Sequence, residues 1–344
     1  MRTDDYDYDL PSGSIAQHPV VPRDACRLLV LDRSSGQVDH RAFRDIGEYL
    51  KPGDALVVNE TRVLPARLRG VKDGSDGAIE VLMLRERYGD TWECLVRPGR
   101  RLQPGAKVVF GDGALTGLVV DVLPESGGRL VQFRAMRGTL LEAVRKLGEM
   151  PLPPYIAEPL SDPELYQTVF AVDERSAAAP TAGLHFTTGL LESLQTSGVR
   201  IVKVELDVGL DTFRPVAEDD PEEHVIHTEH YRVTQRGADA ITDAHERGGR
   251  VVAVGTTVVR ALESAFSDET GRVEAAEGRT GLYILPGHRF RAVDALVTNF
   301  HVPRSTLVMM VSAFAGLDLV MRTYDLALEE GYRFLSFGDA MLIV

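Results

Sequence analysis

The order of apolar and polar residues predicts strands and helices in alternation over much of this chain. Short continuous apolar runs of strand length alternate with longer segments in which apolar residues return every three or four positions. The predicted strands are residues 27–32, 54–59, 200–206, 250–255, 281–285 and 293–298, and the predicted helices are residues 188–195, 237–246, 257–266, 305–314 and 319–329. Such alternation is typical of a largely parallel sheet or barrel with functional loops at the carboxyl ends of its strands.

The region between about residues 63 and 137 has a different pattern. Its short alternating runs, separated by Gly, Pro, Asp and Ser turns, are residues 79–84, 92–96, 107–110, 118–122 and 130–133. This spacing is typical of a small antiparallel barrel or sandwich. A helix capped by Thr139 and Glu142 and a proline-rich link at residues 150–156 follow. We therefore predict an α/β main domain of residues 1–62 and 151–344, sheet-like or barrel-like, with a small antiparallel β-barrel domain inserted at residues 63–150.

Composition restricts the class of protein. The 344 residues carry a net charge of −13, which argues against a generally basic nucleic-acid surface, although Arg97, Arg100 and Arg101 form a dense basic cluster. That cluster is either a solvated turn or a loop that contacts phosphate. The two cysteines, Cys26 and Cys94, lack metal or redox spacing, and no segment resembles a membrane span or a signal peptide. We expect a soluble cytoplasmic protein that does not bind membranes.

Four loops next to predicted strands or helices carry polar residues suited to a site. The most irregular runs from Pro180 to Phe186 and holds His185, whose imidazole can transfer protons near neutral pH. A packed histidine in a turn is the alternative there, and threonine caps or polar turns equally explain the other loops. The candidate residues of these loops and of the C-terminal segment are Thr181, Gly183, His185, Asp207, Gly255, Thr256, Thr257, Arg260, Asn299, His301 and Asp339.

Motifs of several functional classes are missing from the sequence. The segment from Glu223 to His230 contains His224 and His227, but no cysteine accompanies them and no His-Glu-x-x-His spacing occurs, so we expect no metal site. There is no Walker loop, no dinucleotide-binding G-x-G-x-x-G after a strand and no G-x-S-x-G elbow. These absences disfavour an NTPase, a Rossmann dehydrogenase and an α/β-hydrolase.

Motifs along nearly the whole chain resemble one family. They include YDYDLP from Tyr6, NETRVLPARL from Asn59, WECLVRPGRRLQPG from Trp92, APTAGLHFT from Ala179 and VDALVTNFHVPRSTLVMMVSAFAG from Val293. In this order they resemble the S-adenosylmethionine:tRNA ribosyltransferase-isomerases of queuosine synthesis. The resemblance implies an α/β domain interrupted by a small β-barrel, and an enzyme for which S-adenosylmethionine is a ribosyl donor rather than a methyl donor.

The implied substrates are S-adenosylmethionine and a tRNA. The aminomethyl group of a 7-deazaguanine at the tRNA wobble position accepts the ribosyl moiety, which isomerises to give epoxyqueuosine with release of adenine and methionine. The resemblance implies no metal or other cofactor, and we expect a monomer. Because the sulfonium acidifies the neighbouring carbon, the reaction needs a base, and the leaving adenine needs a proton donor.

This chemistry and the resemblance suggest roles for the candidate residues. We predict His185 as the leading base, Asp339 and Asp207 as further proton-handling groups, and Arg260 as the holder of the methionine carboxylate at residues 255–257. The remaining predictions are substrate binding by Thr181, Gly183, Asn299 and His301, and contacts with tRNA phosphates by Arg97, Arg100 and Arg101.

The chain departs from the family pattern after the strand at residues 200–206. Where the family has close to T-L-H-V-G-x-G-T-F, Asp207 replaces the histidine and Asp211 replaces a glycine. Two added carboxylates are poor neighbours for tRNA phosphate, so a catalytically altered tRNA-binding paralogue is an alternative. A further alternative, an S-adenosylmethionine-dependent RNA methyltransferase, would require a glycine-rich loop after its first strand, which the sequence lacks.

Overall fold

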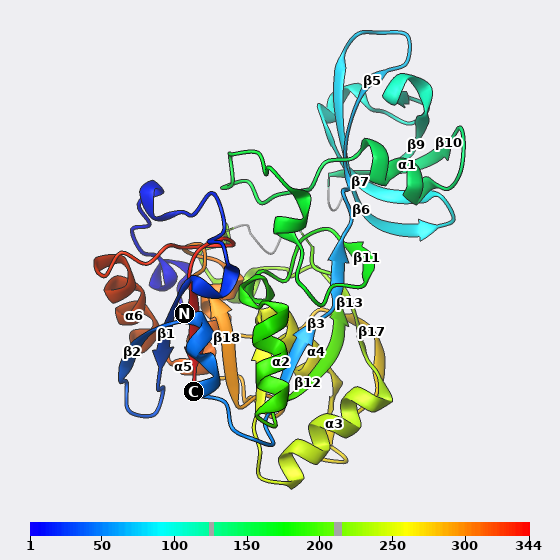
Figure 1. Ribbon diagram of the computed structural model, residues 1–344. Helices are drawn as coiled ribbons and strands as arrows, with labels where there is room; N and C mark the ends of the chain where they lie inside the picture. Colours follow the sequence, from blue (N-terminus) through cyan, green and yellow to red (C-terminus); the bar gives the residue numbers. More distant parts are fainter. Residues whose placement is uncertain (124–126, 210–214) are drawn as a thin grey trace. The chain divides into compact units, whose positions relative to one another are not determined.

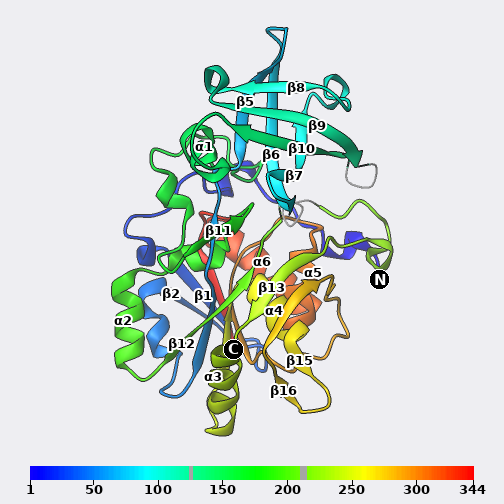
Figure 2. The same ribbon diagram turned by 90° about the vertical axis from the view of Figure 1, so that its right-hand side faces the viewer.

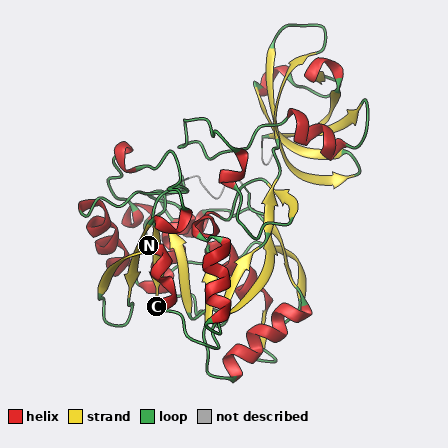
Figure 3. Cartoon of the chain, viewed as in Figure 1, coloured by secondary structure: helices red, strands yellow, loops and turns green. Residues whose placement is uncertain are grey.

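The structure of this protein is a computed structural model that describes residues 1–123, 127–209 and 215–344 (Figure 1 and Figure 2). The chain divides into two compact units. The larger contains Met1–Thr61, Pro153–Asp173 and Ala179–Val344, and the smaller contains Arg62–Leu152 and Glu174–Ala178. The larger unit has a sheet with helices and the smaller a closed barrel (Figure 3), so the predicted fold class is confirmed.

The larger unit is built on one mixed sheet, in which nine strands are described. In spatial order they are β17 (Ala276–Thr280), β13 (Glu229–Val233), β12 (Arg200–Leu206), β3 (Ala55–Asn59), β14 (Val251–Val254), β18 (Ala295–Asn299), β19 (Ala340–Ile343), β1 (Arg27–Leu31) and β2 (Val38–Ala42). The strands β12, β3, β14 and β18 are parallel neighbours, and the last three are buried throughout, as their continuous apolar runs indicate. Antiparallel pairs flank them on both sides.

One predicted strand of this sheet is wrong. Residues 281–285 are a loop, and the neighbouring strand β17 ends before them at Thr280. The backbone N–H of Leu282 donates to Thr280 Oγ1 at 3.0 Å instead of to a sheet partner. A local side-chain acceptor therefore replaces the ladder at this point, which an apolar pattern alone does not reveal.

The C-terminal strand β19 lies inside the sheet. It pairs antiparallel with β18 and parallel with β1, so the two ends of the chain are neighbours in one sheet. All four of its residues are buried. This position explains why the sequence is apolar from Ala340 to Val344.

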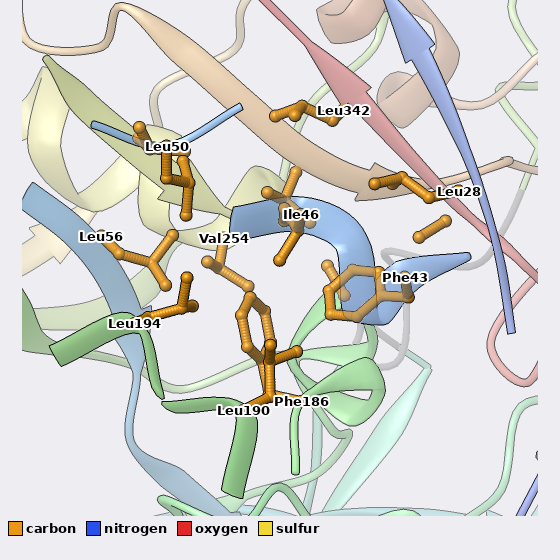
Figure 4. Packing of buried hydrophobic residues seen from close by; sticks show 14 of the residues in the cluster. Leu28, Phe43, Ile46, Leu50, Leu56, Phe186, Leu190, Leu194, Val254 and Leu342 are labelled. Carbon is orange, nitrogen blue, oxygen red and sulfur yellow. The ribbon is translucent and has the colours of Figure 1, made fainter. Parts of the chain in front are cut away.

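The two faces of the sheet are covered by different helices. On one face, Leu56 of β3, Val254 of β14 and Leu342 of β19 pack against α2 (Thr188–Thr196) and the 3-10 helix Phe43–Glu48 (Figure 4). Their neighbours along each strand point to the opposite face, because strand side chains alternate. The helices α3 (Gln235–Glu246) and α4 (Thr256–Ala265) contact β12 and β14.

The remaining described elements of the larger unit are short or lie C-terminal to β18. The helices α5 (Thr306–Ala315) and α6 (Leu317–Glu329) pack against each other, and β15 (Phe266–Ser267) pairs with β16 (Arg272–Val273). Of the helices that the structure describes, none alone is long and apolar enough to cross a membrane; α5 and α6 meet that test only as a pair, bent by 113°. The 3-10 helices of this unit, besides the one named above, are Thr3–Tyr6, Ser12–Ser14, Arg23–Ala25, Pro163–Tyr166, Thr181–His185 and Pro221–Glu223.

The smaller unit is a closed antiparallel barrel. Its strands follow the order β10 (Gly128–Ala135), β7 (Thr91–Arg97), β6 (Ala78–Tyr88), β5 (Arg67–Lys72), β8 (Lys107–Phe110) and β9 (Leu115–Leu123). Closure leaves no strand edge unpaired, and alternate residues such as Leu68, Val81 and Phe133 fill the interior. The helix α1 (Leu140–Leu147) begins with the predicted capping box of Thr139 and Glu142. The other short elements are the 3-10 helices Gly99–Arg101 and Gly111–Gly113 and the paired strands β4 (Thr61–Val63) and β11 (Asp173–Ser176).

Candidate functional site

A cavity in the larger unit lies where central strands of the sheet end. β14 ends at Val254 and β18 at Asn299, and the residues that follow them meet at one edge, as the carboxyl ends of parallel strands do. The residues that line this cavity include Tyr155, Thr181, Val208, Gly255, Thr256, Thr257, Asn299, His301, Leu335 and Ser336. The structure therefore brings together the loops at residues 180–186, 255–257 and 298–306.

Asn299 is the centre of a buried hydrogen-bond chain. Its Nδ2 donates to the carbonyl of Leu335 (3.1 Å) and to Nε2 of His185 (3.0 Å), and its Oδ1 accepts from Thr181 Oγ1 (3.3 Å). Because a carbonyl only accepts, the Leu335 contact fixes the orientation of the amide. Nε2 of His185 must then be an acceptor, so its ring proton lies on Nδ1, which is 3.2 Å from Cys26 Sγ.

His185 itself is 4% exposed and is not among the described residues that line the cavity. Burial, assisted by the charges of Arg333 and Arg23, lowers its pKa from 6.5 to about 3. The imidazole is therefore neutral at pH 7, and both of its nitrogens are engaged. In this geometry His185 holds Asn299, and accepting a substrate proton would require the Asn299 contact to break.

The backbone at Leu335 is strained on the cavity wall. Its φ of 69° lies in the left-handed region, which residues other than glycine seldom adopt. Its N–H donates to the carbonyl of Phe300 (3.2 Å) while its own carbonyl accepts from Asn299. Strain of this kind persists where surrounding contacts fix the backbone, and it clusters at functional sites.

His301 is a second neutral histidine, and it does line the cavity. Its Nε2 is 3.0 Å from Thr298 Oγ1 and its Nδ1 is 3.0 Å from the hydroxyl of Tyr324. The hydroxyl of Tyr8 donates to its backbone carbonyl. Burial lowers the pKa of His301 to about 3, so the cavity wall carries neutral polar groups at pH 7.

The two aspartates predicted to handle protons lie elsewhere. Asp339 is buried, and its carboxylate accepts from the backbone N–H groups of Arg27 (2.9 Å) and Arg333 (2.8 Å). The side chain of Asp207 lies 3.8 Å from Nδ1 of His230. Neither aspartate is among the described residues that line the cavity, and Asp211, the other departure from the family pattern, lies outside the described residues.

Two predicted glycines shape the site through their backbone. Gly255 begins α4 with a φ of 91°, a conformation that favours glycine. Gly183 does not line the cavity but lies in the 3-10 helix Thr181–His185, where a Cβ atom would be 2.7 Å from the ring of Phe170. Glycine therefore lets this turn pack closely and hold Thr181 at the cavity.

A second cavity shares Thr256, Thr257 and Leu307 with the first. Arg260 lines it, but its guanidinium forms a buried ion pair with Glu229 and also donates to the carbonyls of Leu282 (3.0 Å) and Thr280 (3.3 Å). Glu229 in turn accepts from the backbone N–H of Gly209 (2.7 Å). The predicted carboxylate holder is thus already paired within the chain.

Several residues of both cavities escaped the sequence reasoning. Tyr155, whose hydroxyl is 2.7 Å from Ser336 Oγ, lies within the proline-rich link at residues 150–156, which we predicted as a connection rather than as part of a site. The second cavity adds the mostly apolar residues Ile226, Leu282, Tyr283, Ile284 and Met310. Ile226 lies within the histidine cluster, residues 282–284 within the wrongly predicted strand and Met310 within a predicted helix, so their apolar pattern predicted packing rather than a site.

The histidine cluster has no helical face. His224 and His227 both line the second cavity but follow the short 3-10 helix Pro221–Glu223, and His224 Nδ1 contacts Glu218 at 2.9 Å. Across the part of the chain that the structure describes, no group of three or more His, Cys, Asp or Glu side chains could hold a metal ion.

The basic cluster of the sequence lies on the smaller unit, at a groove. Arg100 and Arg101 line this groove together with Lys72 and Lys107, and Asp73 is its acidic residue. Within the described ranges, the side chains of these four cations form no hydrogen bond or ion pair. Arg97, at the end of β7, is not among the described lining residues and lies opposite Glu80 of β6.

A buried arginine holds the turn that presents Arg100 and Arg101. Arg129 donates to the carbonyls of Leu102 (2.6 Å) and Gly99 (2.8 Å), which flank that turn, and also to those of Gly127 and Gly128. Because Arg129 is 7% exposed, these bonds satisfy its charge inside the barrel. The turn is therefore fixed from within while its own arginines face solvent.

Comparison with known proteins identifies the family. A family model described as queuosine biosynthesis protein matches residues 3–343. Relatives named S-adenosylmethionine:tRNA ribosyltransferase-isomerase from Desulfitobacterium hafniense, Symbiobacterium thermophilum and Moorella thermoacetica are 54%, 56% and 55% identical over all of both chains. The crystal structure of S-adenosylmethionine tRNA ribosyltransferase from Thermotoga maritima matches with a TM-score of 0.57 and 38% identity, over 99% of this chain and 100% of that one. The chain belongs to the queuosine biosynthesis protein family.

Proposed function

We propose that this protein is an S-adenosylmethionine:tRNA ribosyltransferase-isomerase. It transfers the ribosyl moiety of S-adenosylmethionine to the aminomethyl-7-deazaguanine at the tRNA wobble position and isomerises it, releasing adenine and methionine. The observation that carries this proposal is identity of 54–56% to relatives of that name over the full length of both chains. No contact among the described residues favours a methyltransferase or a non-catalytic paralogue.

The first cavity suits the charge of this substrate. S-adenosylmethionine carries a sulfonium, an ammonium and one carboxylate, so its net charge is positive. The described lining of the first cavity contains no Lys or Arg, and its histidine His301 is neutral. Neutral donors and acceptors such as Thr181 and Asn299 can orient a cationic substrate without repelling it.

For His185 we propose a positioning role in the same reaction. Its neutral ring fixes the amide of Asn299, and Asn299 in turn faces the cavity with Thr181. The competing assignment, His185 as the base, requires the imidazole to leave Asn299 during turnover. Asp339 and Asp207 are weaker candidates for proton transfer, because neither is among the described lining residues.

We also propose that the basic groove of the smaller unit contacts tRNA phosphates. Arg100, Arg101, Lys72 and Lys107 have no carboxylate partner among the described residues, although the chain is acidic overall. Unpaired cations gathered at one groove attract a polyanion, and release of its counterions favours binding. Arg97, part of the same sequence cluster, would contact the tRNA outside this groove.

The proposed enzyme acts in the cytoplasm as a monomer and needs no cofactor besides the S-adenosylmethionine it consumes. Its two cysteines are buried free thiols, which suits a reducing compartment. Light scattering of the purified chain tests the monomer, and turnover after dialysis against a chelator tests the absence of a metal.

One assay tests the reaction. The protein is incubated with S-adenosylmethionine and a tRNA that carries the aminomethyl-deazaguanine, and the small-molecule products are separated. Free adenine and methionine in equal amounts, together with an epoxyqueuosine-containing tRNA, are expected. S-adenosylhomocysteine would indicate methyl transfer instead, and tRNA binding without any product would indicate a non-catalytic paralogue.

A further inference from the structure

The first turn of α4 offers unused hydrogen-bond donors to both cavities. Gly255 begins the helix without a side-chain cap, and its carbonyl accepts from the N–H groups of Val258 and Val259. The N–H groups of Thr256 and Thr257 have no acceptor among the described residues. Both threonines line both cavities, so these donors lie where a ligand would be. Free N–H groups and the helix dipole together favour an anion at such a position.

A second observation at this turn points to a ligand. The side chain of Thr257 is 7% exposed, and its Oγ1 is buried with no hydrogen-bond partner. A buried hydroxyl without a partner is unfavourable, and in native proteins such a group usually meets a water or a ligand. The helix α6 begins at a glycine too, but it carries Asp318 in its first turn, whereas the first turn of α4 contains no acidic residue.

The cation next to this turn does not compete for an anion. Arg260 is the one Lys or Arg among the described residues that line the two cavities, and Glu229 neutralises it. Its remaining donors face the carbonyls of Leu282 and Thr280. An anionic group in these cavities would therefore be bound by α4 rather than by a free guanidinium.

We infer that the first turn of α4 binds the α-carboxylate of the methionyl part of S-adenosylmethionine. The N–H groups of Thr256 and Thr257 and the hydroxyl of Thr257 donate to the two carboxylate oxygens. Arg260 acts indirectly, because its pairing with Glu229 fixes the wall next to that turn. This inference rests on the proposed function for the identity of the ligand.

The test compares S-adenosylmethionine with its decarboxylated analogue, which keeps the sulfonium, the ammonium and the adenosine. Adenine release with saturating tRNA gives kcat/KM for each donor, and their ratio measures discrimination for the carboxylate. We expect the wild type, with three donors to the carboxylate, to favour S-adenosylmethionine by more than about a hundredfold. In Thr257→Val this ratio should fall by about 10- to 100-fold, the size expected for a hydrogen bond to a charged group. Thr257→Ser, which keeps the hydroxyl, should retain the ratio.

The outcomes separate the inference from the proposed function. A wild type that releases adenine from both donors with equal kcat/KM overturns the carboxylate site and leaves the reaction intact. Equal losses for both donors in Thr257→Val would also overturn it, because they indicate a structural defect. Wild-type protein that releases no adenine from S-adenosylmethionine contradicts the proposed function itself. If Thr257→Val does not fold, the wild-type ratio and Thr257→Ser still decide the question.

Discussion

The cavity of the larger unit and the groove of the smaller unit are built from opposite kinds of polar group. At the cavity, Asn299 and His301 are neutral and hydrogen-bonded to other residues of the chain, and the neutral ring of His185 holds Asn299 from behind the lining. In the groove, Arg100 and Arg101 are charged, exposed and unpaired among the described residues. The fixed dipoles of the cavity need not reorient when a substrate enters. The charges of the groove attract a polyanion over a distance.

This difference explains how one acidic chain can bind two substrates of opposite charge. Orientation of a small cationic donor needs fixed dipoles, and a net positive cavity would repel it. Attraction of a polyanion needs charge, and a carboxylate beside each cation would cancel it. Mutations should therefore act on turnover in the cavity and on salt-dependent tRNA affinity in the groove.

The largest effect is expected at Asn299. Asn299→Ala removes the side-chain donor to the Leu335 carbonyl and the partner of Thr181, and it should lower kcat for adenine release by about 10²- to 10³-fold, as loss of one fixed polar group in an active site does. The KM for tRNA should change little. Single-turnover adenine release at saturating substrates measures the effect, and a kcat within threefold of wild type would remove Asn299 from the site.

Variants of His185 distinguish a residue that positions Asn299 from a catalytic base. If His185 positions Asn299, His185→Ala should lower kcat by about tenfold, and His185→Gln should restore most of it because a glutamine amide can accept from Asn299. If His185 is the base, Ala and Gln should both lose about 10²- to 10⁴-fold, and the pH dependence of kcat should lose a limb. Unchanged adenine release in His185→Ala would contradict both roles.

Loss of the groove cations should have a large effect on tRNA binding. Changing Lys72, Arg100, Arg101 and Lys107 together to Gln should raise the KM for tRNA by about 10- to 100-fold and reduce the slope of log K against log [salt] by about three, the value for four phosphate contacts. The KM for S-adenosylmethionine should not change. Arg69→Gln is the matched control, because this barrel arginine is already paired with Glu149 at 3.0 Å. An unchanged salt dependence would show that the groove does not meet the backbone of the tRNA.

Arg97 tests the sequence cluster separately from the groove. It is exposed but is not among the described residues that line the groove. Because we propose that Arg97 contacts a tRNA phosphate outside the groove, Arg97→Gln should raise the KM for tRNA by about as much as Arg100→Gln does. A change of less than about twofold would limit the tRNA-binding surface to the groove.

Arg129 should have a smaller effect on tRNA, through the shape of the turn. Arg129→Met removes the side-chain donor from the carbonyl of Leu102 and leaves that of Gly99 with the N–H of Leu102 alone, so the turn loosens while the groove keeps its four cations. We expect a few-fold rise in the KM for tRNA and a loss of about 2–3 kcal/mol in the stability of the barrel, typical of hydrogen bonds to a charged group. Trp92, the chain's one tryptophan, lies in the barrel and reports its unfolding by fluorescence.

The sequence predicted the elements whose pattern comes from burial alone. The continuous apolar runs at residues 54–59 and 250–255 are buried central strands because both of their faces are covered, and alternating runs became the barrel. The strand at residues 281–285 could not be recognised as wrong, because a single side-chain acceptor, Thr280 Oγ1, diverts the backbone there.

The candidate site could be predicted only as a set of loops. The loops of Thr181, Thr256 and Asn299 meet because they follow or adjoin neighbouring strands, a consequence of topology. Partners within the site were not predictable, because they depend on side chains far apart in the chain. Cys26 contacts His185 and Glu229 contacts Arg260 across long sequence separations, and those contacts decide which group is free to meet a ligand.

A different kind of effect concerns the stability of the larger unit against pH. The pKa of His185 and that of His301 fall from 6.5 to about 3 in the folded chain. Below pH 6.5 the unfolded chain therefore binds two protons that the folded chain does not. The contribution of the two neutral histidines to the free energy of unfolding is complete above pH 6.5 and is lost as the pH falls toward 3. Between pH 7.5 and 5.5 the two residues together should lower the free energy of unfolding by about 3 kcal/mol.

Amide hydrogen exchange in β14 and β18 measures this loss in the larger unit. His185→Gln should halve the loss. His245 is the control of opposite sign, since its hydrogen bond to Asp294 raises its pKa and stabilises the folded chain as the pH falls, so His245→Gln should steepen the loss. Equal protection at the two pH values in the wild type would mean that these histidines are not held neutral by burial.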